Sequence, residues 1–145
     1  MCIRDSLYDR EERLTTDKTT TSKLAFAKEM LRLQSLAKTD KANAEDYLYK
    51  MALGFYNTTY YGYAWELVEY YRSGSDGYYI PKDATTFQKN YYGCFTAHDY
   101  FKMAMDASSK NEFKAKCLFM IAKCVQKQLR MPQYGDFDSN NWDKY

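Results

Sequence analysis

The stretch that decides the fold is Lys110–Arg130, which reads KNEFKAKCLFMIAKCVQKQLR. At 100° per residue, Lys116, Lys123, Lys127 and Arg130 fall within about 60° of one another around a helix. The apolar residues cover roughly half of the circumference or more, which is wider than the stripe of a helix at the edge of a bundle. We therefore predict a helix over 110–130 that is packed between neighbours on two sides.

Another helix is predicted immediately before it, over 92–108, with apolar residues on one face and charged residues on the other. Ser109 and Glu112 fit an S-x-x-E capping box, so the next helix would start at once. A link this short predicts an antiparallel hairpin. The apolar face of 92–108 consists of Cys94, Ala97, Tyr100, Phe101, Ala104 and Met105.

Three further helices are predicted upstream, over 22–38, 44–57 and 60–72. Ser22 and Asn43 are the expected N-caps of the first two. The turn-forming residues 73–77 end the third, and a long irregular connection follows, with room for a short extra helix after Asp83. Only two prolines interrupt the chain. The prediction is an all-α fold of antiparallel helix pairs, with about five main helices.

The helical-repeat domain is predicted to span 22–131, as a fragment of a longer array. We expect 1–21 to be a disordered or artefactual lead-in and 132–145 to be a polar tail. Residues 1–6, Met-Cys-Ile-Arg-Asp-Ser, resemble translated sequencing-adapter read-through. The native N-terminus would then lie outside this chain together with any export signal, which leaves the localisation open, the cell envelope included.

A short motif occurs twice, as Tyr60-Tyr61-Gly62 and, 31 residues later, as Tyr91-Tyr92-Gly93. Each copy is expected to open a helix, and periods in the thirties are typical of helix–turn–helix solenoids. The segments Ala97–Ala107 and Phe113–Ala122 also alternate small and large residues across the predicted hairpin.

On these residues the chain resembles tetratricopeptide-type repeats over roughly 44–130. The stretch 53–71, together with 113–127, also looks like the C-terminal part of large uncharacterised bacterial proteins. The resemblance implies a right-handed solenoid of stacked helix pairs. It further implies scaffolding and peptide recognition on a concave face, without chemistry.

Aromatic residues are abundant, with 16 Tyr, 8 Phe and 2 Trp. Tyrosine suits helix–helix interfaces whose edges are exposed to water, and it is also enriched in binding surfaces. Packing between helices is the favoured interpretation. Our main hypothesis is a non-enzymatic protein–protein interaction scaffold that binds a peptide or partner helix on a Tyr-rich surface. The alternative is a carbohydrate-binding helical-repeat module at the bacterial cell envelope. The candidate contact residues are Tyr60, Tyr63, Trp65, Tyr78 and Tyr79.

Catalytic and metal-binding motifs are weak in this sequence. His98 is the sole histidine and follows Cys94 by four residues, but two ligands do not make a metal site. Cys94 lies on the predicted buried face, which argues against a nucleophilic thiolate. Asp136 and Asp138 resemble the opening of an EF-hand loop, but Asn141 stands where the loop needs glycine. We predict no enzyme activity, no cofactor and no metal; an enzyme would need a second histidine or an acidic pair from sequence outside the chain.

The net charge of +2 gives no general case for nucleic acid as a partner. The basic residues of 110–130 could meet nucleic acid or an acidic peptide, but a solvated helix face is the favoured interpretation. No stretch of about 18 uninterrupted apolar residues exists, so no transmembrane helix is predicted.

Overall fold

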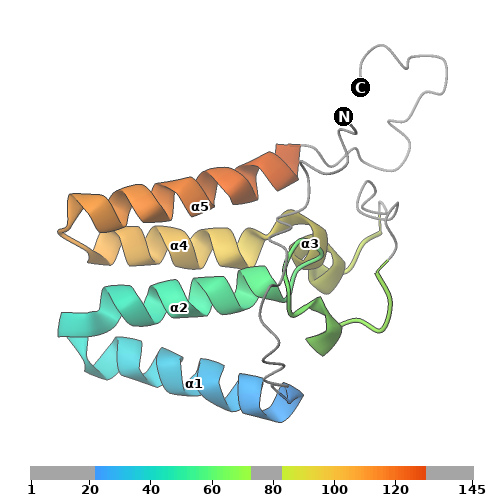
Figure 1. Ribbon diagram of the computed structural model, residues 1–145, viewed down its shortest axis with the longest axis horizontal. Coiled ribbons are helices and arrows are strands. Elements are labelled where there is room, and N and C mark those ends of the chain that lie inside the picture. Colours follow the sequence, from blue (N-terminus) through green and yellow to red (C-terminus); the bar gives the residue numbers. More distant parts are fainter. Residues whose placement is uncertain (1–21, 73–82, 130–145) are drawn as a thin grey trace, which may run out of the picture.

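The computed structural model describes residues 22–72 and 83–129, and these are helical, without strands (Figure 1). The all-α prediction is confirmed. The helices are α1 (Lys23–Thr39), α2 (Ala44–Asn57), α3 (Thr86–Gly93), α4 (Phe95–Ala107) and α5 (Asn111–Leu129), with short 3-10 turns η2 (Lys41–Asn43) and η3 (Trp65–Leu67).

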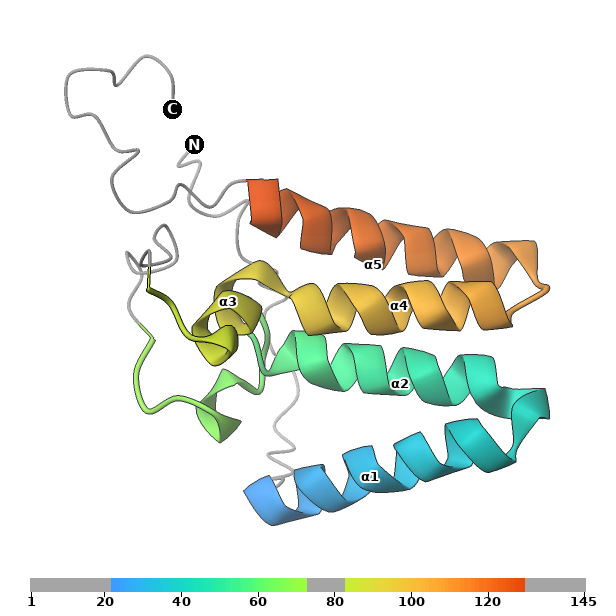
Figure 2. The same cartoon turned by 180° about the vertical axis from the view of Figure 1, so that it is seen from behind.

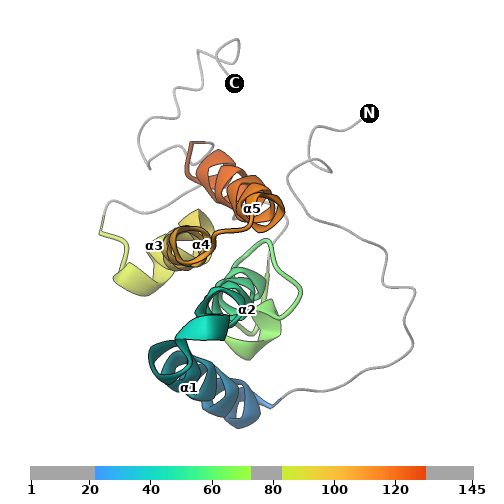
Figure 3. The same cartoon turned by 90° about the vertical axis from the view of Figure 1, so that its left-hand side faces the viewer.

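Four of the helices form two antiparallel hairpins, α1–α2 and α4–α5 (Figures 1 and 2). The hairpins join through α2 and α4, which share the most extensive interface, while α1 packs on α2 and α5 on α4. Seen along the helices, α1 and α5 are the two outer members of the row (Figure 3). The predicted antiparallel hairpin of the last two helices is confirmed.

The first hairpin begins as predicted, because the Ser22 hydroxyl accepts a hydrogen bond from the N–H of Ala25 at 3.1 Å. Asn43 occupies the N-cap position of α2, but its side chain donates to Asp40 Oδ2 instead of capping the helix. Gly54 brings the two helices close, since a Cβ added there would lie 2.8 Å from the sulfur of Met30.

The core lies between α2 and α4 and extends to α5. Ala52, Ala97 and Ala104 are fully buried, and such small side chains allow the helices to approach closely. The ring of Tyr49 meets those of Phe101 and Phe113 edge-on, with centroids 5.3 and 5.5 Å apart. Edge-to-face pairs of this kind stabilise a core by roughly 0.5–1.5 kcal/mol beyond the burial of area.

The prediction of a helix over 60–72 is wrong. Only η3 is helical there, and the backbone folds back on α2, with the N–H of Ala64 donating to the carbonyl of Asn57 at 2.9 Å. The Arg72 guanidinium donates to the carbonyls of Tyr60 and Gly62 at 2.9 and 3.3 Å. A side chain thus satisfies backbone groups that a helix would have satisfied itself.

The predicted start of a helix at residue 92 is also wrong. Tyr91-Tyr92-Gly93 closes α3, and Cys94, with a φ of 54°, separates α3 from α4. The short extra helix expected after Asp83 is confirmed as α3, which begins with a capping box between Thr85 and Gln88. The two Tyr-Tyr-Gly copies therefore do not open equivalent helices.

The prediction that 110–130 is an interior layer is wrong for the part of the chain that the structure describes. α5 buries Cys117, Met120, Cys124 and Lys127 on one side only. Leu118, Phe119 and Leu129 are 53%, 64% and 80% exposed. At its start, the Ser108 hydroxyl accepts from the N–H of Lys110, one residue before the predicted Ser109 cap. The wide apolar arc is real, but its outer half faces solvent.

Candidate functional site

A cavity of about 280 Å³ opens where the start of α1, the end of α2 and the start of α4 meet α3 and the segment after α2. Aromatic and aliphatic side chains dominate its lining. The lining residues are Phe26, Phe55, Thr58, Thr59, Val68, Phe87, Asn90, Tyr91, Thr96 and Ala97.

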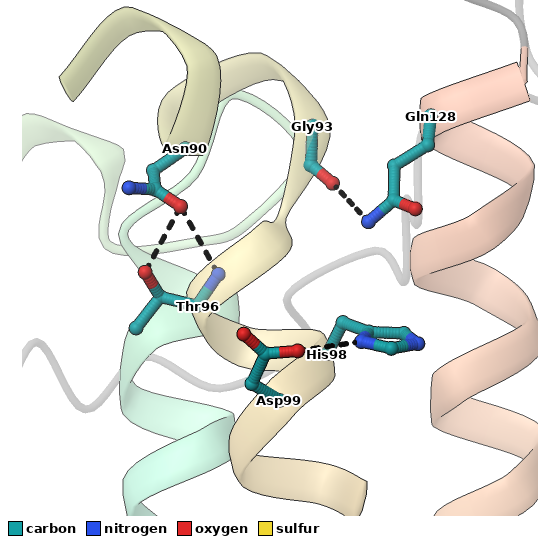
Figure 4. Close-up of polar contacts among 6 residues, drawn as sticks. All are labelled: Asn90, Gly93, Thr96, His98, Asp99 and Gln128. Carbon is teal, nitrogen blue, oxygen red and sulfur yellow. Dashed lines mark hydrogen bonds and ion pairs between the residues drawn. The ribbon is translucent and has the colours of Figure 1, made fainter. Parts of the chain in front are cut away.

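One wall of the cavity is fixed by polar contacts around the α3–α4 junction (Figure 4). Asn90 Oδ1 accepts from the N–H and the hydroxyl of Thr96, at 3.1 and 2.9 Å. Gln128 Nε2, from α5, donates to the carbonyl of Gly93 at 2.9 Å. These bonds hold the backbone on both sides of Cys94, so this wall is ordered before any ligand arrives.

The threonines of the lining use their hydroxyls locally. Thr58 donates to the carbonyl of Phe55 at 3.0 Å, and Thr59 donates to that of Tyr56 at 2.7 Å. Both bonds satisfy carbonyls at the C-terminal end of α2, which would otherwise lack helical partners. The cavity is therefore predominantly apolar in what it offers a ligand.

Tyr91, which lines the cavity, belongs to a cluster of aromatic rings. The ring of Tyr60 meets Tyr91 edge-on at 6.0 Å and lies 5.5 Å from Tyr92. Phe87 stacks on Tyr91 at 5.8 Å. The Tyr91 hydroxyl is buried without a hydrogen-bond partner within 22–72 and 83–129. Burial raises the pKa of Tyr91 to about 12.

Buried thiols lie beneath the same junction. Cys94 Sγ donates to Thr59 Oγ1 at 3.6 Å. A hydrogen bond to Cys94, followed by burial, raises the pKa of the Cys124 thiol. A raised pKa keeps a thiol protonated, whereas a nucleophilic or metal-binding cysteine needs the thiolate. In this arrangement the thiols act as small buried hydrophobes that also donate hydrogen bonds.

His98 does not join Cys94. Its Nδ1 lies 3.0 Å from Asp99 Oδ1 on the same helix, and the ring extends towards α5 (Figure 4). Across 22–72 and 83–129, the structure brings together no group of three or more His, Cys, Asp or Glu side chains that could hold a metal ion.

The predicted contact residues differ in how exposed they are in the structure. Tyr60 is 2% exposed and belongs to the core, so it supports the surface from beneath. Trp65 is half-buried, with the Arg72 guanidinium 5.0 Å from its ring centroid. Tyr63 is 38% exposed. Tyr78 and Tyr79 lie outside the described residues. Among the described residues, the exposed aromatics that the prediction missed are Tyr70, Tyr71, Phe87, Phe95 and Phe119.

The basic residues of α5 differ from the solvated face that was expected. Lys116, Lys123 and Lys127 place their ammonium groups over the rings of Tyr49, Tyr56 and Tyr61, at 4.4, 5.9 and 4.7 Å from the centroids. Lys127 is only 1% exposed. The sequence signal was present, since these lysines align on the side of the helix that carries Met120 and Cys124. Arg130 lies outside the described residues.

Neither described range contains a helix with the length and apolar character that crossing a membrane requires. Comparison of the chain with protein-family models, with curated proteins and with solved structures finds no match.

Proposed function

We propose that this chain is a non-enzymatic protein–protein interaction module that binds a peptide or partner helix by receiving an apolar side chain in the cavity. One observation carries the proposal. The cavity is apolar, and Val68 and Phe87, which are 37% and 46% exposed, belong to its lining and remain open to solvent. Exposed apolar residues beside a hollow are typical of a protein-binding surface.

The size of the cavity favours a side chain over a larger ligand. Pockets for drug-sized molecules measure roughly 300–1,000 Å³, and this one measures about 280 Å³. Such a volume is large enough for one anchor side chain, such as phenylalanine or leucine. Anchor residues that fill a pocket carry most of the binding energy in many interfaces.

Tyrosines near the cavity would extend the contact. Tyr70 is 97% exposed and Tyr71 is 75% exposed. The Lys23 ammonium lies 5.5 Å from the Tyr70 ring centroid, close along α1 to Phe26 of the cavity lining. Tyrosine is enriched at interfaces because it offers a large apolar body and a hydroxyl at modest entropic cost.

The tetratricopeptide-like character of the chain is part of the same proposal. It is supported by two consecutive antiparallel hairpins that pack through α2 and α4. The segment that separates them contains η3 and α3, and this segment forms much of the cavity. The proposed peptide site therefore lies at the connection between two helix pairs.

The test is a selection from a random-peptide phage library on the immobilised full chain, followed by fluorescence polarisation with an enriched peptide. We expect the enriched sequences to share one large apolar residue. The V68W substitution would place an indole in the cavity and weaken binding at least tenfold, or about 1.4 kcal/mol.

M103W is the matched control, because Met103 is 51% exposed on α4 and does not line the cavity. We expect it to bind with an unchanged Kd. A selection that enriches nothing, or a folded V68W protein that binds as tightly as the wild type, would contradict the proposal.

Exposure of Tyr70 and Tyr71 also favours a second candidate function, carbohydrate binding, because exposed tyrosine rings can stack on sugar faces. A glycan array distinguishes the two. Saturable binding that is lost in the Y70A/Y71A variant supports a carbohydrate ligand, and an array without signal favours the peptide.

A further inference from the structure

The outer face of α5 carries a regular apolar seam. Its members are separated by three, four, three and four residues, which is the a/d spacing of a coiled coil. Leu118 and Leu129 are 53% and 80% exposed, Ala115 and Ala122 are exposed, and Val125 is half-buried. The seam consists of Ala115, Leu118, Ala122, Val125 and Leu129.

This seam lies opposite the buried face of the helix, which carries Cys117 and Cys124. α5 is also the last helix of the row (Figure 3). From Ala115 to Leu129 the seam is about 21 Å long at 1.5 Å per residue. It is long enough for two heptads of contact, and no helix among the described residues covers it.

From this geometry we infer that the seam binds a second copy of the same chain, with the two α5 helices antiparallel across a two-fold axis. Reversing the seam on itself places Ala115 opposite Val125, and Leu118 opposite Ala122, of the second copy. Each of these layers combines one alanine with one branched side chain, while Leu129 falls opposite Asn111 at the two ends. The central part of the surface is therefore complementary to itself, as a two-fold interface requires.

The residues beside the seam agree with this occupant. In an antiparallel pair, Phe119 faces Phe119 of the other copy on one flank, and Ile121 faces Ile121 on the other. Lys114 falls opposite Gln128, so no two like charges oppose each other. Three further lysines of α5 lie over tyrosine rings and leave no row of positive charge that would call for an acidic partner.

The test measures the mass of the full chain by sedimentation equilibrium. We expect a concentration-dependent dimer, twice the 17.2 kDa of the chain, with a Kd on the order of 10–100 µM because the seam is short. L118E should be monomeric throughout. L31E is the matched control, since Leu31 is 65% exposed on α1 at the other edge, and it should dimerise like the wild type.

A charge pair tests the antiparallel register. F119E alone and F119K alone should each be monomeric, because the two-fold brings like charges together, and an equimolar mixture should dimerise again. Recovery in the mixture also shows that both variants fold. A wild-type monomer at 200 µM, a dimer that L31E breaks and L118E does not, or a mixture that stays monomeric would overturn the inference.

Discussion

The backbone N–H of Tyr60 donates a hydrogen bond to the carbonyl of Tyr91, with 2.9 Å between nitrogen and oxygen. The two Tyr-Tyr-Gly motifs therefore lie side by side, and the rings of Tyr60 and Tyr91 meet edge-on. Their likeness in sequence corresponds to one shared aromatic contact instead of two equivalent helix starts. This contact connects the end of α2 to α3 behind the cavity.

The Y91F substitution should stabilise the protein. The Tyr91 hydroxyl is buried without a partner in the described ranges, and an unsatisfied buried donor costs about 1–3 kcal/mol. We expect the free energy of unfolding in urea to rise by about 1 kcal/mol or more. Y92F, one residue along α3, is the control and should bring no comparable gain.

The same tyrosine should make the wild type sensitive to alkali. Its pKa is raised by burial to about 12 in the folded protein, from an ordinary value of 10.0. The folded state therefore binds the phenolic proton more tightly than the unfolded state does. Titration of this group leaves the free energy of unfolding unchanged below pH 10 and lowers it as the pH rises towards 12. Y91F should retain more of its stability over this interval, as followed by circular dichroism; equal losses in both proteins would contradict the assignment.

Phe101 should be among the most costly residues to truncate. Its side chain is fully buried between α2 and α4, and removing a buried phenylalanine ring costs about 3–5 kcal/mol. M103A changes an exposed residue on the same helix and should stay within about 0.5 kcal/mol of the wild type. Urea denaturation measures both, and a small loss for F101A would place the core elsewhere.

Gly62 and Gly54 should respond differently to alanine. A Cβ at Gly62 would lie 2.3 Å from the Asn57 carbonyl oxygen, against backbone that cannot yield, so we expect a loss of about 1–3 kcal/mol. At Gly54 the nearest atom is the flexible Met30 sulfur, and the gain in helix propensity of about 1 kcal/mol offsets the adjustment. Thermal melts should rank G62A well below G54A.

Acid should weaken the contact between Glu45 and Lys110, whose Oε1 and Nζ are 2.6 Å apart. The hydrogen bond from Lys110, and then that from Ser108, holds the pKa of Glu45 below its ordinary 4.5. The stabilisation is therefore present above pH 4.5 and disappears as the pH falls through the lower, folded value. E45Q should differ from the wild type near neutral pH and converge with it in acid, whereas E112Q, at an exposed position, should follow the wild type throughout.

Helix positions were predictable where the apolar period was regular. The residues of α1, α2, α4 and α5 follow a 3.6-residue pattern, and the predicted ranges agree with the observed helices to within a few residues. The segment 60–72 has the same pattern in its aromatics, yet it is mostly irregular. Its conformation depends on a bond from Arg72 to the Tyr60 carbonyl and on the close approach of Gly62 to Asn57, and no local pattern reveals such contacts.

The candidate site was less predictable for the same reason. Phe26 and Phe87 are 61 residues apart in the sequence. They line one cavity only because α1 and α3 both lie beside the end of α2. Lys127 looked like a solvated charge, but the Tyr61 ring lies 4.7 Å from its ammonium group. The sequence predicted how wide the apolar arc on α5 is. It did not show whether another helix of the same domain packs on that arc.

Hydrogen bonds run from Cys124 through Cys94 to Thr59, so these thiols are held inside the core. Their chemical reactivity therefore reports how often the core opens. Cys94, Cys117 and Cys124 are each no more than 1% exposed, so an alkylating reagent reaches them only when the surrounding elements separate. The rate at which these three thiols are modified therefore counts those openings directly. Motions of the deepest layer can thus be timed at cysteines that the chain already carries.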